Sequence, residues 1–155
     1  MKTVAVAGGT GGLGKYIVQA LLERPQDFKV IILTRDTSKT HAPTGAQPRQ
    51  VDYTSVDSLT QALKNVDWLV SAVTTLATGE EQIKMADACK AAGVYAFIPS
   101  EFGIDTSLPE NQLDIVAGKR AVAEHCKKIG LNCVRVMSGC FTDTFFLPWF
   151  EVDLG

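Results

Sequence analysis

The glycines at positions 8, 11 and 14 carry the clearest chemical signal in the sequence. They follow an apolar run with valine at alternate positions, residues 4–7, and precede a helical pattern that begins at Lys15. In this context the first glycine permits a sharp turn, the second lets the backbone approach a diphosphate, and the third lets helix and strand pack closely. A helix N-terminus favours the same anion through its free N–H groups. The spacing predicts a dinucleotide site formed by Gly8, Thr10, Gly11, Gly12, Leu13 and Gly14.

The end of the second predicted strand indicates which dinucleotide is bound. In NAD sites an acidic residue about 20 positions beyond the glycines binds the ribose 2′-hydroxyl. Thr34 and Arg35 occupy that place here, followed by Asp36 and Lys39. Because a guanidinium binds a phosphate through two parallel hydrogen bonds, Arg35 favours NADP, and Lys39 is assigned to the same site. A solvent-exposed loop arginine is the alternative interpretation of Arg35.

Lys119 is a charged residue on the apolar side of a predicted helix, residues 113–129. At about 100° per residue, one stripe of this helix contains Ile115, Lys119, Val122, Cys126 and Ile129. An ammonium there must extend to water, find a partner, or sit in a pocket with its pKa lowered. A pocket lysine suits proton transfer near neutral pH and hydrogen bonding to a ribose. Periodicity alone does not decide between this role and a lysine whose head reaches water.

The elements that must position these residues alternate between strands and helices. Strands are predicted at 4–7, 29–34, 49–52, 68–73, 95–98 and 131–137, and helices from 15, at 55–65, at 79–92 and at 113–129. This order predicts an α/β fold, a doubly wound parallel sheet of six strands with helices on both faces (Rossmann-like). Ligands bind outside the carboxyl ends of such strands, so Ser71 and Val73 are predicted to line the crevice, with Ser100 after the fifth strand.

Composition narrows the class of protein. The chain has 155 residues, which predicts one domain, and its 46% apolar content and net charge of −2 predict a soluble protein without a bias toward nucleic acid. No apolar run approaches the roughly 20 residues of a membrane span, and the first strand leaves no room for a signal peptide. A cytoplasmic protein is therefore expected. The four cysteines are widely spaced, which favours reduced thiols over a metal site.

Two motifs together resemble a known family. The sequence Ile-Pro-Ser-Glu-Phe-Gly stands at 98–103, after the fifth predicted strand, and Gly-Gly-Thr-Gly-Gly-Leu-Gly stands at 8–14. The pair resembles the NmrA-like / isoflavone reductase-like family of atypical short-chain dehydrogenase/reductases. The similarity extends from Met1 to about Trp149 and includes Gly-Cys-Phe at 139–141.

The resemblance implies a role for Lys119. Reductases of the isoflavone reductase-like group carry a helix lysine about eleven residues before a glycine-led segment, and counting back from Gly130 reaches Lys119. In that group the lysine is taken to act as general acid/base and to hold the ribose. The larger short-chain group uses Tyr-x-x-x-Lys, but Ile115 stands four residues before Lys119. The implied activity is an NADP-dependent reduction of a small aromatic or natural-product-like molecule, with Lys119 as proton donor.

The chain also departs from the family, whose members are considerably longer. An apolar tail, 141–155, stands where the substrate lobe would follow. Because exposed apolar surface favours being covered, we expect this tail to form a homodimer; folding back over the crevice, or a fragment of a longer protein, are the alternatives. Two other functions stay open. One is a redox-sensing regulator that binds the dinucleotide without turnover, and the other is a cofactor-independent isomerase, cyclase or lyase on the same scaffold.

Overall fold

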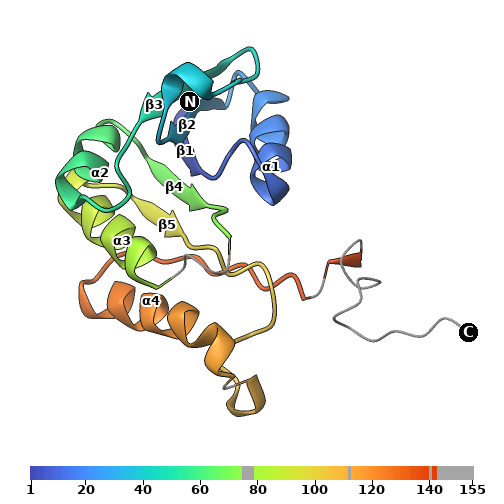
Figure 1. The fold of residues 1–155 in the computed structure, drawn as a ribbon, viewed down its shortest axis with the longest axis vertical. Helices are drawn as coiled ribbons and strands as arrows, with labels where there is room; N and C mark the ends of the chain where they lie inside the picture. The colour runs from blue at the N-terminus through green and yellow to red at the C-terminus, as the bar shows by residue number, and fades with distance from the viewer. Residues whose placement is uncertain (75–78, 112, 140, 143–155) are drawn as a thin grey trace, which may run out of the picture.

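The computed structural model describes residues 1–74, 79–111, 113–139 and 141–142. Within these residues a parallel sheet of five strands has the order β3-β2-β1-β4-β5 (Figure 1). The strands are β1 (Lys2–Ala7), β2 (Phe28–Thr34), β3 (Ala46–Gln50), β4 (Trp68–Ser71) and β5 (Ala96–Ile98). The order of the strands reverses between β1 and β4, which is where doubly wound sheets bind ligands.

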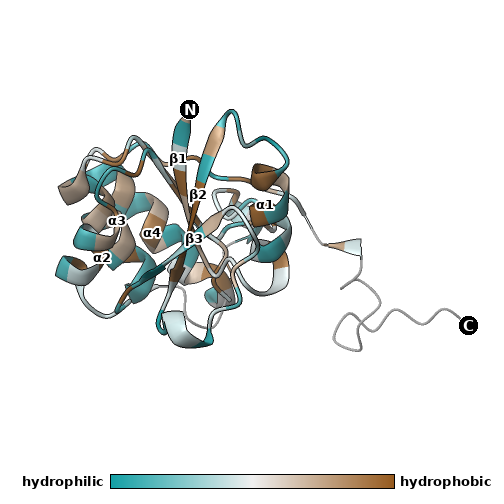
Figure 2. Cartoon of the chain, turned by 90° about the horizontal axis from the view of Figure 1, so that it is seen from above, coloured by the Kyte–Doolittle hydropathy of each residue, from teal (hydrophilic) through white to brown (hydrophobic). Residues whose placement is uncertain are grey.

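Helices cover both faces of the sheet, as predicted. They are α1 (Gly12–Leu22), α2 (Val56–Ala62), α3 (Glu80–Ala92) and α4 (Ala117–Lys128), with short 3₁₀ turns η1 (Thr37–Lys39), η3 (Pro109–Asn111) and η4 (Asp114–Val116). Figure 2 shows α1 on one side of the strands and α2, α3 and α4 on the other. The Rossmann-like α/β class is thereby confirmed.

The central strand β1 explains why the two layers form. Val4 and Val6 pack with Val18 of α1 in one apolar cluster, whereas Ala5 and Ala7 belong to the cluster beneath the other three helices. Both sets are fully or almost fully buried. A strand that is buried on both faces needs an apolar residue at every position, which is the pattern that the sequence shows. The carboxyl end of β1 is therefore held firmly from both sides.

The predicted sixth strand, residues 131–137, is not formed as a strand in the described part of the chain. A single parallel bridge joins Cys133 to Phe97 of β5, with Phe97 N–H donating to Asn132 O at 2.9 Å and Val134 N–H donating to Phe97 O at 2.9 Å. Beyond Val134 the ladder stops because the next rung would need an N–H group from Pro99, the residue after β5, and proline has none. The strand count is corrected from six to five for this reason.

Other boundaries differ by a few residues. β3 covers 46–50 rather than 49–52 and includes Pro48, which an edge strand tolerates because its outer side needs no N–H donor. The 113–129 helix begins only at Ala117, after the 3₁₀ turn η4. Two helix ends lie where the predicted ranges place them: Ser55 Oγ accepts a hydrogen bond from Ser58 N–H at 3.2 Å and caps α2, and Gly93 ends α3 at φ 72°.

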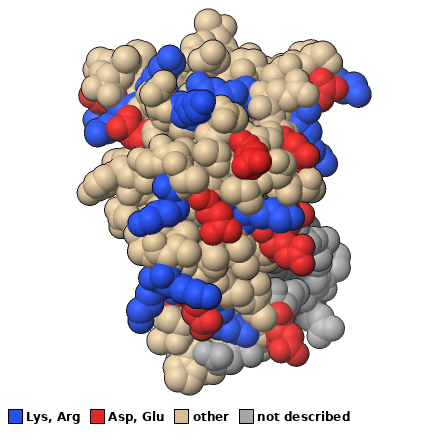
Figure 3. Space-filling view, turned by 90° about the vertical axis from the view of Figure 1, so that its left-hand side faces the viewer, with Lys and Arg blue, Asp and Glu red and all other residues tan. Residues whose placement is uncertain are grey.

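Charged side chains of both signs lie on the face of the molecule that Figure 3 shows. On the face shown in Figure 3, basic and acidic side chains are interspersed. No described helix is both long enough and apolar enough to cross a membrane. Within the described ranges, no three His, Cys, Asp or Glu side chains are grouped so that they could hold a metal ion.

Candidate functional site

The turn between β1 and α1 leaves no room for side chains at two of its glycines. Gly8 has φ +75°, and a Cβ atom there would lie 2.7 Å from the carbonyl oxygen of Ala72. A Cβ atom at Gly14 would lie 2.1 Å from the carbonyl oxygen of Gly8. Only glycine fits these two positions, so the helix packs directly against the end of the strand.

The same turn is open on its outer side. A Cβ atom added at Gly11 or Gly12 would meet nothing within 4 Å. Gly11 is the N-cap of α1, no side chain caps this helix, and its first turn contains no acidic residue. Thr10 is exposed and Leu13 is half-buried at the rim. An uncapped helix N-terminus beside open space fits a phosphate group, which the backbone N–H groups and the helix dipole would favour.

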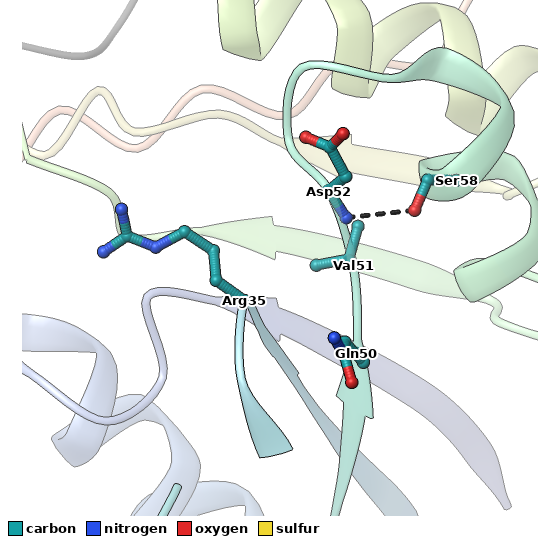
Figure 4. A pocket seen from close by; sticks show the side chains of 5 residues that line it. All are labelled: Arg35, Gln50, Val51, Asp52 and Ser58. Carbon is teal, nitrogen blue, oxygen red and sulfur yellow. Dashed lines mark hydrogen bonds between the residues drawn. The ribbon is translucent and has the colours of Figure 1, made fainter. Parts of the chain in front are cut away.

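Arg35 stands at the carboxyl end of β2, beside a pocket of about 390 Å³. The lining residues are Arg35, Gln50, Val51, Asp52 and Ser58 (Figure 4). The guanidinium stands apart from the Asp52 carboxylate, which accepts hydrogen bonds from the Thr54 hydroxyl at 2.7 Å and the Thr54 N–H at 2.8 Å. These bonds hold the pKa of Asp52 below its ordinary value. Among the described residues Arg35 has no ion pair, so it can accept an anion.

Lys39 is not brought into this pocket. Its side chain is 85% exposed, and its Nζ atom lies 3.4 Å from the Asp36 carboxylate one turn earlier. Asp36 also accepts hydrogen bonds from the hydroxyl of Ser38 at 2.6 Å and from its N–H at 3.0 Å. Lys39 thus pairs with Asp36 and does not line the pocket beside Arg35, although both residues follow the same strand.

The carboxyl ends of β4 and β5 are tied together. The Ser100 hydroxyl donates to the Val73 carbonyl oxygen at 2.7 Å, and the Ser100 N–H donates to Gln82 Oε1 of α3 at 2.7 Å. Val73 and Ser100 are half-buried, but Ser71 is fully buried and presents no side-chain surface to a ligand. Of the three predicted crevice residues, the structure leaves Val73 and Ser100 accessible.

Lys119 turns inward from α4 toward the loop after β5. Its Nζ atom donates a hydrogen bond to the backbone carbonyl oxygen of Glu101 and would lie 3.6 Å from a Cβ atom at Gly103. Burial lowers the pKa of the Lys119 ammonium, and the negative charge of Glu101 acts in the opposite direction. The amine is therefore held against the protein at a half-buried position and is not extended into bulk water.

A chain of contacts connects the glycine turn with this amine. The backbone of Gly8 packs against the backbone of Ala72. The carbonyl oxygen of the next residue, Val73, accepts a hydrogen bond from the Ser100 hydroxyl. The carbonyl oxygen of Glu101, which follows Ser100, accepts a hydrogen bond from Lys119 Nζ. All of these groups lie at the carboxyl ends of β1, β4 and β5 or directly after them. The glycine turn and a half-buried amine therefore share one edge of the sheet.

Sequence reasoning missed several residues of this edge. Arg135 of the 131–137 segment reaches Glu101 and Thr106, and it stands as a charge within an apolar run, the same signal that singled out Lys119. Tyr53 is a second such residue: its hydroxyl donates to the Leu33 carbonyl oxygen at 3.0 Å, two residues before Arg35. Burial raises the pKa of Tyr53 to about 12. No pattern in the sequence would have shown this contact.

Comparison with known proteins decides the family. A model of the NmrA-like family matches residues 1–153. The chain belongs to this family. Among curated relatives, this NmrA-like chain is 39% identical to "Oxidoreductase swnN" of Metarhizium robertsii, over 70% of the chain and 33% of the relative. It is 32% identical to "Bifunctional pinoresinol-lariciresinol reductase 2" of Linum usitatissimum, over 92% of the chain and 48% of that relative.

Solved structures show the same fold. The NmrA-like chain matches "AtPrR2 with NADP+ and (+)pinoresinol" with a TM-score of 0.78 and 29% identity, covering 93% of the chain and 52% of that structure. It matches the binary complex of leucoanthocyanidin reductase with NADPH from Vitis vinifera with a TM-score of 0.74 and 27% identity, covering 87% and 47%. The chain thus spans about half of the length of these proteins.

Proposed function

We propose that this NmrA-like chain binds NADPH and acts as a reductase of a small aromatic or natural-product-like molecule. The observation that carries the proposal is the N-terminus of α1, which no side chain caps and which has open space at Gly11 and Gly12. Arg35, which has no ion-pair partner among the described residues, lies at the same edge of the sheet. The solved relatives that bind NADP⁺ or NADPH support the same cofactor for this chain.

The described residues fit NADPH at its diphosphate, its 2′-phosphate and its adenosine. The diphosphate would be held by the backbone at 8–14, and the 2′-phosphate by Arg35. The pocket beside Arg35, which Val51 and Ser58 also line, would receive the adenosine end. NADPH, when bound, would supply a hydride to the substrate. Lys119 would supply the proton, and because burial lowers its pKa it is a stronger acid than an exposed lysine.

Nicotinamide fluorescence tests the proposal. We expect NADPH to bind more tightly than NADH, and Arg35→Ala to weaken NADPH binding about tenfold or more, because one charge-assisted interaction with phosphate is lost. The matched control is Arg24→Ala, which removes an arginine paired with Asp27 at 2.6 Å before the opposite end of β2. Equal NADPH affinity in both variants would contradict the assignment of Arg35.

The same titration separates the alternative functions. Tight NADPH binding without oxidation in the presence of aromatic carbonyl or benzylic ether compounds would favour a redox-sensing regulator. Absence of binding by either nucleotide would favour a cofactor-independent isomerase, cyclase or lyase. NADPH consumption that depends on such a compound, and is lost in Lys119→Met, supports the reductase.

We also propose one domain, 1–155, that works in the cytoplasm as a homodimer through the apolar segment 141–155. Of that segment only Phe141 and Thr142 belong to the described residues, and Phe141 is 36% exposed. Light scattering after size exclusion tests the dimer. We expect a dimeric mass for the chain and a shift toward the monomer when apolar residues of the segment, such as Phe145 and Phe146, are replaced by serine.

A further inference from the structure

Glu101 is a buried carboxylate that the proposed reaction does not use. Its side chain is 1% exposed, and its Oε1 atom accepts a hydrogen bond from Arg135 Nε at 2.9 Å. Its Oε2 atom is buried without a hydrogen-bond partner in the described part of the chain. Burying a charged group in this way is unfavourable unless it is compensated. The position of Glu101 therefore calls for a reason beyond packing.

The loop that contains Glu101 is fixed from several sides. Arg135 bridges it, since its Nη2 atom also donates to Thr106 Oγ1 at 2.5 Å, and Thr106 is fully buried. Gly139 N–H donates to Gly103 O at 3.0 Å. Phe102 has φ +29°, which is strained for a bulky side chain and persists only where surrounding contacts hold the backbone. The segment after α4 thus holds the loop that faces Lys119.

We propose that Glu101 is the positioning residue for Lys119: its carboxylate, fixed by Arg135, holds the loop carbonyl that binds Nζ and places a negative charge beside the ammonium. The lysine would thereby stay protonated at a half-buried position and remain aimed along the sheet edge. This inference deepens the proposed function, because a protonated and oriented amine is what proton donation to a substrate requires.

Other charged groups near Lys119 are engaged elsewhere. On α4 itself, Arg120 donates to the carbonyl oxygens of Asn111 and Leu113. Between α3 and α4, His125 pairs with Asp87 at 2.6 Å. From the segment after α4, Arg135 faces Glu101. Among these groups Glu101 is the carboxylate whose charge raises the pKa of Lys119 against the effect of burial.

The titration of Lys119 tests the inference without substrate or cofactor. In the full chain labelled with ¹³C- and ¹⁵N-lysine, NMR follows the Lys119 side-chain signals against pH, and Lys119→Met assigns them. We expect Glu101→Gln to lower the pKa of Lys119 by about one unit, because the adjacent negative charge is lost. The matched control Glu124→Gln removes an exposed carboxylate from α4 and should leave the titration unchanged. An unchanged titration in folded Glu101→Gln overturns the inference.

Arg135→Gln provides a second variant with a different expected direction. It loosens the loop but keeps the Glu101 charge, so the pKa of Lys119 should stay or rise. A fall equal to that in Glu101→Gln would show that loop position, and not the carboxylate, controls Lys119, and would overturn the inference. Failure of NADPH to bind would reject the proposed function alone, since this titration uses the protein without nucleotide.

Discussion

The Nζ atom of Lys119 donates a hydrogen bond to the backbone carbonyl oxygen of Glu101, 18 residues earlier in the chain. The contact joins helix α4 to the loop that follows β5, and therefore fixes a cationic group beside the carboxyl edge of the sheet. Lysines on helix surfaces commonly extend into water. In this protein the inward position instead gives the amine a defined place relative to the glycine turn.

Replacement of Lys119 by methionine should change the pH dependence of stability. Folding lowers the pKa of Lys119 below 10.5, so between the two pKa values the unfolded chain binds more protons and stability rises with pH. Lys119→Met should lack this rise. At pH 7 we expect its free energy of unfolding to stay within about 1 kcal/mol of wild type, because solvent screens a half-buried amine. Urea unfolding of wild type and Lys119→Met at pH 7 and pH 10 measures the stability and its pH dependence. An equal rise in stability with pH in wild type and variant would contradict the prediction.

Two glycine substitutions should separate packing from binding. Gly14→Ala brings a Cβ atom to 2.1 Å from the Gly8 carbonyl oxygen, and should lower the free energy of unfolding by at least about 3 kcal/mol. Gly11→Ala meets open space at φ −133° and should lower it by less than about 1 kcal/mol. It should nevertheless weaken NADPH binding, because the methyl group would occupy the place proposed for the diphosphate. Denaturant unfolding and nucleotide titration of Gly14→Ala and Gly11→Ala check this prediction. Similar losses of stability in the two variants would contradict it.

Ser100→Ala should weaken the junction between β4 and β5. The hydroxyl donates at 2.7 Å to the Val73 carbonyl oxygen, and loss of a partly buried hydrogen bond lowers stability by about 1 kcal/mol. Ser107→Ala is the control, since that exposed hydroxyl bonds only its near neighbour Asp105 at 2.6 Å in the described structure, and should change stability by less than about 0.5 kcal/mol. If Ser100→Ala lowers NADPH affinity while stability is unchanged, Ser100 acts on the ligand directly.

Tyr53 should ionise late in an alkaline titration. Burial raises its pKa from the ordinary 10.0 to about 12, so its contribution to stability is complete below pH 10 and is lost as pH rises through 12. Tyr53→Phe should remove an absorbance step near pH 12 and leave the earlier part of the titration intact. At pH 7 the lost bond to the Leu33 carbonyl oxygen should cost about 1 kcal/mol. A step that disappears near pH 10 instead would contradict this assignment.

Local patterns in the sequence were sufficient for the order of the elements. The apolar run of β1, the glycines after it and the Ser55 and Gly93 caps each depend on a few neighbouring residues, and all are formed where they were predicted. Buried strands need apolar residues and sharp turns need glycine, whatever the rest of the chain does. The α/β class follows from the alternation of these elements.

Contacts between distant segments could not be predicted in this way. The Arg135–Glu101 ion pair joins the segment after α4 to the loop after β5, across 34 positions of the chain. Sequence periodicity left Lys119 undecided between water and protein, and only the packing of α4 beside the loop after β5 fixes it inward. Residue types and spacing determined the fold class and the glycine turn after β1, whereas the environment of the amine depends on which segments the tertiary structure brings together.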